Sequence, residues 1–270
     1  MTKKQRYLFD ITGYLHLKSV LTSEILRTTQ EAVNRYINTP VDQMPDGFGF
    51  TELYQNGFAF DKSLEALTMH PVTWPIVKEL TDDKPRLNRG SLVVETHEKQ
   101  TMTPFHCARE DCGWQTRRYE VRNGRIFCND IIAFFYFTDV YPGDGGLLVL
   151  PGSHKSEFQR PDGLFLSDLE DPNPVLHSAI KNITPRAGDV IVLSELTTHG
   201  VLIWQPKDRD RRFLILRYKT QYFQDHRGER DTYSRELMDK LSPETQELMS
   251  YESYWHDKEI VKRETGDLSL

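Results

Sequence analysis

The sequence has few cysteines and no long apolar run. Cys107, Cys112 and Cys128 are odd in number, close together and without CxxC spacing, which favours reduced thiols over a disulfide framework. No stretch approaches the roughly 20 apolar residues that a bilayer span needs. The N-terminus also lacks the apolar segment of a secretory signal. We therefore expect a cytoplasmic protein without a membrane partner.

A surplus of basic charge is also missing. The formal net charge is −6, and the scattered acidic residues leave no basic face for nucleic acid or for an anionic membrane. A chain of 270 residues is long enough for one β-sandwich or barrel domain with helical additions. We expect one domain over residues 1–270, a monomer or homodimer that acts on a small molecule and binds no nucleic acid.

Short β-rich runs fill the middle of the chain. They are SLVVETH, DIIAFFYFTDV, GGLLVLPGSH, GDVIVLSEL and RRFLILRY, each bounded by Gly, Pro, Asn or Asp. No helical pattern lies between them to make βαβ crossovers. The sequence predicts a mainly β fold with flanking helices, whose antiparallel jelly-roll core spans about 91–220. The polar, proline-bearing segment 156–187 is typical of a surface insertion.

Helices are predicted toward both ends. Thr22 can cap a helix that runs to Asn38. A second helix begins between Pro71 and Pro75, and the tail holds another, with Ser242 and the proline after it in the N-cap and first-turn positions.

Two histidines and an arginine lie where a jelly roll can bring them together. The segment GDVIVLSELTTH predicts a strand that ends at His199, and Arg211 begins the next β-rich run. Together with His106 they offer two imidazoles, which suit Fe(II), and one guanidinium, which forms a bidentate pair with a carboxylate. Asn129, which opens the NDIIAFF run, can donate an amide hydrogen bond to a co-substrate or simply start the strand.

TDVYPGDGGLLVLPGSHKS, GDVIVLSELTTHG and the arginine that follows resemble the phytanoyl-CoA dioxygenase family of Fe(II)- and 2-oxoglutarate-dependent oxygenases. The resemblance covers most of the chain. It implies a double-stranded β-helix of the cupin-like, jelly-roll type. Iron is expected on a His-X-Asp pair and a later His, with 2-oxoglutarate on an arginine and O2 as the oxidant. His106, His199 and Arg211 match these positions, and Phe135 matches an aromatic residue beside the co-substrate.

The activity that the resemblance implies is oxidation of an unactivated C–H bond. The outcome would be hydroxylation, desaturation or oxidative cleavage, with release of succinate and CO2. An acyl-CoA thioester carries several phosphates, and the sequence offers no basic cluster to receive them. We therefore expect a small, free metabolite as the substrate.

Ala108 departs from this pattern, because it occupies the position of the aspartate. A methyl group cannot coordinate a metal, so the missing charge has to come from elsewhere. We expect Glu195, four residues before His199, to be the third ligand, and we place Glu110 and Asp111 on a solvated loop. One alternative is a bound chloride, as in the related halogenases that have Ala or Gly at this position. The other is a non-catalytic jelly-roll binding protein without a metal.

Overall fold

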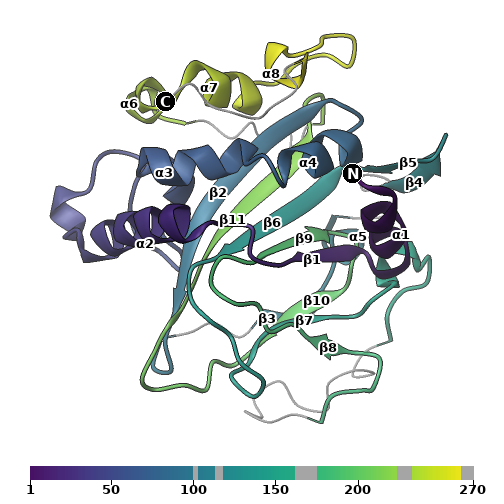
Figure 1. The fold of residues 1–270 in the computed structure, drawn as a ribbon, viewed down its shortest axis with the longest axis horizontal. Helices are drawn as coiled ribbons and strands as arrows, with labels where there is room; N and C mark the ends of the chain where they lie inside the picture. The colour runs from purple at the N-terminus through teal and green to yellow at the C-terminus, as the bar shows by residue number, and fades with distance from the viewer. Residues whose placement is uncertain (100–102, 113–117, 162–174, 224–232, 263–270) are drawn as a thin grey trace.

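Two antiparallel sheets form the centre of the protein in this computed structural model (Figure 1). The structure describes residues 1–99, 103–112, 118–161, 175–223 and 233–262. The larger sheet has the order β1 (Tyr14–Leu17), β9 (Val190–Ser194), β6 (Asp130–Tyr136), β11 (Arg211–Thr220), β2 (Pro85–Glu95). The smaller sheet has the order β3 (Thr103–His106), β10 (His199–Leu202), β7 (Gly146–Val149), β8 (Lys181–Asn182). A separate hairpin joins β4 (Tyr119–Arg122) to β5 (Arg125–Cys128).

This architecture confirms the predicted jelly-roll class with flanking helices. Every strand pair in the described residues is antiparallel, and the two sheets do not close into one barrel there. The helices are α1 (Lys3–Thr12), α2 (Ser23–Asn38), α3 (Lys62–Glu65), α4 (Trp74–Leu80), α5 (Ala108–Cys112), α6 (Arg235–Lys240), α7 (Pro243–Met249) and α8 (Glu259–Lys262). Short 3-10 turns lie at Val41–Gln43, Gly57–Ala59, Ala66–Met69 and Ser153–Lys155. Most of the helices lie over the outer face of the larger sheet, above it in Figure 1.

Strand β6 separates two cores because successive side chains point to opposite faces. Ile131, Ala133 and Phe135 pack against the helical layer. Ile132, Phe134 and Tyr136 point into the space between the sheets. All seven residues of the strand are buried, as expected of a strand covered on both faces.

The predicted helix starts are confirmed. Thr22 caps α2 by accepting a hydrogen bond from the backbone N–H of Ile25 at 3.3 Å. Ser242 caps α7, with a proline in its first turn. Helix α1 is not among the helices predicted from the sequence, although Thr2 and Gln5 form a capping box at its start, which is a recognisable sequence signal.

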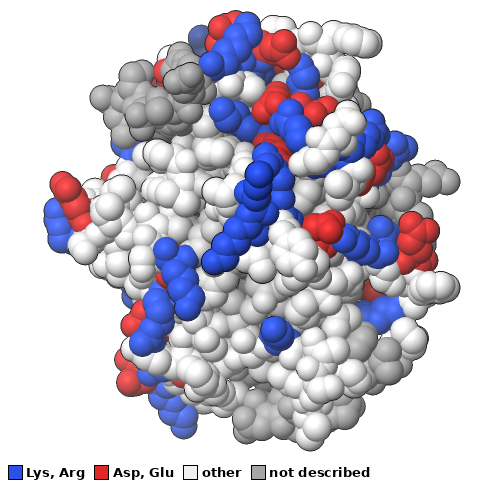
Figure 2. Space-filling view, turned by 45° about the vertical axis from the view of Figure 1, so that its right-hand side comes forward, with Lys and Arg blue, Asp and Glu red and all other residues white. Residues whose placement is uncertain are grey.

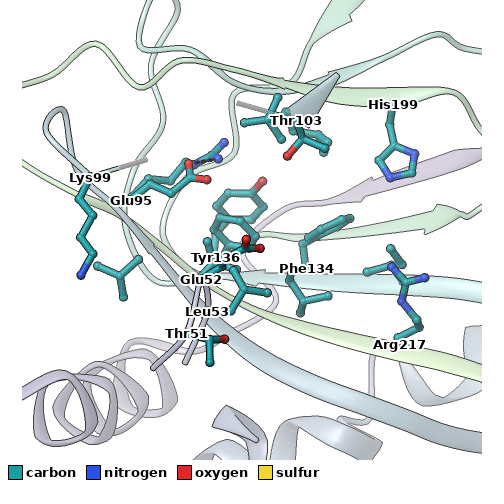
Figure 3. A pocket seen from close by; sticks show the side chains of 18 of the residues that line it. Thr51, Glu52, Leu53, Glu95, Lys99, Thr103, Phe134, Tyr136, His199 and Arg217 are labelled. Carbon is teal, nitrogen blue, oxygen red and sulfur yellow. Dashed lines mark hydrogen bonds and ion pairs between the residues drawn. The ribbon is translucent and has the colours of Figure 1, made fainter. Parts of the chain in front are cut away.

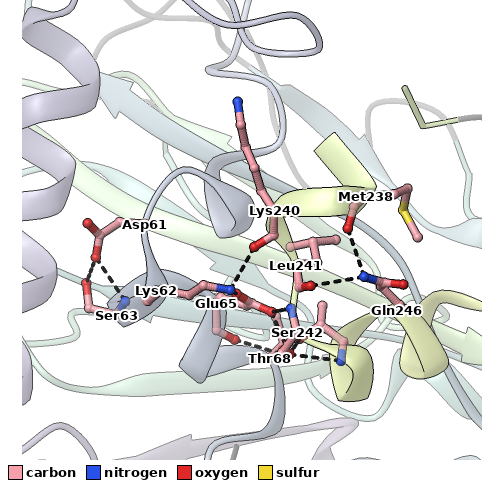
Figure 4. Close-up of polar contacts among 11 residues, drawn as sticks. Asp61, Lys62, Ser63, Glu65, Thr68, Met238, Lys240, Leu241, Ser242 and Gln246 are labelled. Carbon is pink, nitrogen blue, oxygen red and sulfur yellow. Dashed lines mark hydrogen bonds and ion pairs between the residues drawn. The ribbon is translucent and has the colours of Figure 1, made fainter. Parts of the chain in front are cut away.

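The carboxylate of Glu65 attaches the C-terminal helices to α3 (Figure 4). Its Oε1 accepts hydrogen bonds from the backbone N–H and the hydroxyl of Ser242, both at 2.7 Å. Lys62 donates to the other oxygen at 2.7 Å. Burial opposes ionisation, but these donors outweigh it and hold the pKa of Glu65 below its usual value.

Two expectations need correction. His199 does not end a strand: β9 stops at Ser194, and His199 begins β10, which pairs with β3 and β7. The 156–187 segment is also not a surface insertion throughout, because β8 pairs with β7 and Ile180 and Ile183 are buried. Residues 162–174 of that segment lie outside the described residues.

Acidic and basic side chains are mixed on the face shown in Figure 2. Several basic side chains have an acidic neighbour, as in the ion pair between Lys155 and Asp10 at 2.7 Å. Within the described ranges, no helix combines the length and the apolar character that crossing a membrane requires.

Candidate active site

A pocket of about 420 Å³ lies between the two sheets (Figure 3). Strands β2, β6 and β11 of the larger sheet form one wall, and β3, β7 and β10 form the other. Residues 50–53 also line it. Five charged side chains and two histidines line it: Glu52, Glu95, Lys99, Arg211, Arg217, His106 and His199.

The two histidines predicted as metal ligands lie side by side in this pocket. His106 ends β3 and His199 begins β10, and their Cα atoms are register partners. Their ring centroids are 4.3 Å apart. Antiparallel pairing therefore brings together two side chains that are 93 positions apart in the sequence.

Each ring is oriented by a backbone carbonyl two residues earlier. His106 Nδ1 lies 2.9 Å from the carbonyl oxygen of Pro104, and His199 Nδ1 lies 2.7 Å from that of Thr197. A carbonyl can only accept, so each Nδ1 has to carry the hydrogen. In the neutral rings the lone pair is then on Nε2, which is the arrangement that metal-binding histidines commonly have.

Ala108 cannot supply the negative charge of the site. Its side chain is buried, and its backbone N–H donates to the carbonyl oxygen of Glu195 at 2.7 Å. Among the residues that the structure describes, no group of three His, Cys, Asp or Glu side chains is placed to hold a metal. Within these residues the two histidines therefore form a pair and are not part of a larger group of potential ligands.

Glu195 has a different partner in this structure. Its buried carboxylate forms an ion pair with Arg217 at 3.0 Å, and Arg217 lines the pocket whereas Glu195 does not. Coordination of a metal by Glu195 would require the carboxylate to leave this arginine. Glu110 pairs instead with Arg160 at 3.2 Å, and the Asp111 side chain lies outside the described part of the chain.

Arg211 is buried in the pocket wall at the start of β11, and only 1% of its side chain is exposed. It forms an ion pair with Glu95 of β2. Its Nε is buried without a hydrogen-bond partner in the described residues. Alternate residues of β11, from Arg211 to Arg217, line the pocket, so this strand presents an arginine near each end.

The other two candidate residues lie away from this pocket. Phe135 belongs to the core under the helices, and its neighbours Phe134 and Tyr136 line the pocket instead, a shift of one position. Asn129 lines a separate cavity beside the β4–β5 hairpin, where its Oδ1 accepts from the backbone N–H of Arg118 at 2.8 Å. Asn129 therefore bonds with Arg118 at the base of the hairpin and does not line the pocket between the sheets.

Tyr136, which the sequence analysis did not single out as a ligand, projects into the pocket (Figure 3). Its ring stacks on Phe213 with a centroid distance of 5.1 Å. Burial raises the pKa of its hydroxyl to about 12, so the hydroxyl stays protonated near neutral pH. It is therefore a potential hydrogen-bond donor inside the pocket.

Comparison with known proteins identifies the family. A family model described as phytanoyl-CoA dioxygenase matches residues 9–201. The chain belongs to the phytanoyl-CoA dioxygenase family. Members of this family are iron- and 2-oxoglutarate-dependent oxygenases, so the protein is an oxidoreductase of that class. A comparison with curated proteins found no match.

Solved structures share the fold at low sequence identity. HygX from Streptomyces hygroscopicus, with nickel and 2-oxoglutarate bound, is 22% identical with a TM-score of 0.66, covering 88% of this chain and 94% of HygX. The carbocyclase SnoK from nogalamycin biosynthesis is 19% identical with a TM-score of 0.60, covering 90% and 92%. EctD from S. alaskensis is 16% identical with a TM-score of 0.63, covering 84% and 78%.

Proposed function

We propose that His106 and His199 hold Fe(II), that Arg211 receives the distal carboxylate of 2-oxoglutarate, and that the protein oxidises a C–H bond of a small metabolite. The observation that carries this proposal is the histidine pair. Its two rings are 4.3 Å apart, each with Nδ1 engaged by a carbonyl, in the same pocket as a buried arginine. Imidazole nitrogens suit Fe(II), and a guanidinium matches a carboxylate in two parallel hydrogen bonds.

The pocket residues have separate roles in this reaction. Bound iron, with 2-oxoglutarate and dioxygen, supplies the oxidising power for breaking a C–H bond, with succinate and CO2 as co-products. Arg211 neutralises the distal carboxylate from a buried position, where the interaction is strong. Tyr136 offers a neutral hydroxyl as a second donor. Phe134 and Phe213 keep the pocket wall apolar and limit the access of water.

Glu195 is the proposed third ligand, and its carboxylate would have to leave Arg217 to bind the metal. The anionic co-substrate supplies negative charge to the site whether or not Glu195 binds.

A small, free metabolite is the proposed substrate. The size of the pocket supports it, and so do the small molecules found in related structures, hygromycin B in HygX and nogalamycin RO in SnoN. Cys107 and Cys128 are both free and buried, which supports a reducing compartment such as the cytoplasm.

Metal content and co-substrate turnover test the proposal. His106→Ala and His199→Ala should each lose stoichiometric iron and succinate formation. His256→Ala is the matched control, because it removes an exposed histidine that does not line the pocket. Full iron content in both pocket variants would refute the assignment.

A further inference from the structure

Glu95 is the direct cross-strand neighbour of Arg211. The two residues are register partners on β2 and β11, and their side chains form an ion pair. Side chains at directly opposite positions of an antiparallel pair lie within contact distance. The strand pairing itself therefore places this carboxylate beside the arginine that is proposed to receive the co-substrate.

The guanidinium of Arg211 has little freedom to move away from Glu95. Gly146 of β7 lies against it, because a Cβ at that position would come within 2.5 Å of Arg211 Nη1. The rings of Phe213 and Trp204 lie 5.1 Å and 6.0 Å from the guanidinium carbon. Glu95 also lines the pocket, where 12% of its side chain is exposed. A ligand that reaches Arg211 therefore meets Glu95 as well.

We propose that Glu95 competes with the distal carboxylate of 2-oxoglutarate for Arg211 and thereby sets the affinity for this co-substrate. The proposal rests on the function proposed above. Glu95 thus determines how strongly the protein discriminates between 2-oxo acids with and without a second carboxylate.

The physical reason is that two like charges have to share one cation. A guanidinium has five N–H donors, so it can contact two carboxylates. The two carboxylates nevertheless repel each other, and the buried setting screens this repulsion poorly. Glu95 has to turn away from Arg211 or remain as a like charge beside the ligand. Both outcomes weaken binding of a distal carboxylate, and neither affects a ligand without one.

Glu95→Gln keeps the shape of the side chain and removes its charge. Isothermal titration calorimetry with nickel-loaded protein measures binding without turnover. We expect the Kd for 2-oxoglutarate to fall by about tenfold in this variant. The Kd for 2-oxopentanoate, which has the same chain length but no distal carboxylate, should stay within about twofold of the wild-type value.

Glu52→Gln is the matched control. Glu52 also lines the pocket, but its carboxylate forms no ion pair with the described residues. The Glu52→Gln variant loses the same charge, and its Kd values for 2-oxoglutarate and 2-oxopentanoate should stay within about twofold of the wild-type values. Equal tightening by both substitutions would indicate a general charge effect and would overturn the competition.

The remaining outcomes separate the inference from the proposed function. Weaker 2-oxoglutarate binding by Glu95→Gln would show that Glu95 positions Arg211 and would overturn the inference. An unchanged Kd for 2-oxoglutarate would overturn it as well. In both cases wild-type binding would leave the proposed function intact. Wild-type protein that binds no 2-oxoglutarate would refute the proposed function and the inference with it.

Discussion

Arg217→Met tests whether Glu195 is able to become a metal ligand. The ion pair joins Arg217 Nη2 to Glu195 Oε1 at 3.0 Å, with 22% and 4% of the side chains exposed. Removing one partner of a fully buried pair costs about 3–5 kcal/mol. Because Arg217 is partly exposed, we expect the free energy of unfolding of the metal-free protein to fall by about 2–3 kcal/mol.

The same substitution should strengthen metal binding. Glu195 no longer has to leave a cation before it coordinates, so the Kd for Ni(II) should fall by about tenfold or more. Saturating metal should then restore part of the lost stability, because the ion binds only the folded state. Urea unfolding with and without Ni(II), together with calorimetric metal titration, measures both effects.

Arg212→Met is the matched control for this experiment. Arg212 lies on the same strand, β11, five positions before Arg217. It pairs with Asp210 at 2.5 Å and does not line the pocket. It should leave the metal affinity unchanged. If Arg217→Met destabilised the protein equally with and without metal, at an unchanged Kd, Glu195 would not be a ligand and the reasoning would fail.

Three further predictions concern the pocket and the fold. Tyr136→Phe should raise the Kd for 2-oxoglutarate about three- to tenfold through loss of one hydrogen bond, with little change in the Kd for metal; calorimetry that shows equal 2-oxoglutarate affinity would remove Tyr136 from the site. The folded-state pKa of Glu65 is depressed. Its contribution to the stability of the fold is therefore fully present above its unfolded pKa of about 4.3 and is lost as pH falls through the folded value. Chemical unfolding at pH 3 and 7 should show a smaller pH dependence for Glu65→Gln than for wild type, and identical dependence would contradict this. Product mass with and without chloride should be the same if Glu195 supplies the third ligand, and a product that gains the mass of chlorine would support a halide there.

Local patterns were enough to predict the fold class and the helix caps. The β-rich runs were found because β-branched and aromatic residues cluster between turn residues, and Thr22 and Ser242 occupy recognisable N-cap positions. The four-residue strands β3 and β10 are too short to produce a periodic signal, so His199 was assigned to the end of the preceding strand.

The pocket-facing side of β6 was not predictable from its sequence. All residues of β6 are apolar after Asp130 except for the hydroxyl of Tyr136, and both faces are buried. No polar alternation therefore distinguishes Phe135 from its neighbours. The pairs Glu95–Arg211 and Glu195–Arg217 arise from strand register and tertiary packing, and their members lie far apart in the sequence.

The central claim is that His106 and His199 hold one iron ion in the pocket where Arg211 receives 2-oxoglutarate. Anaerobic titration of the Fe(II)-loaded protein with 2-oxoglutarate, followed by visible absorption, tests it most directly, because the chelate has a weak charge-transfer band. We predict a saturable band for the wild type, no band for His199→Ala, and for Arg211→Ala the same band only at higher 2-oxoglutarate concentrations. An undiminished band in His199→Ala, with one iron per chain, would contradict the account.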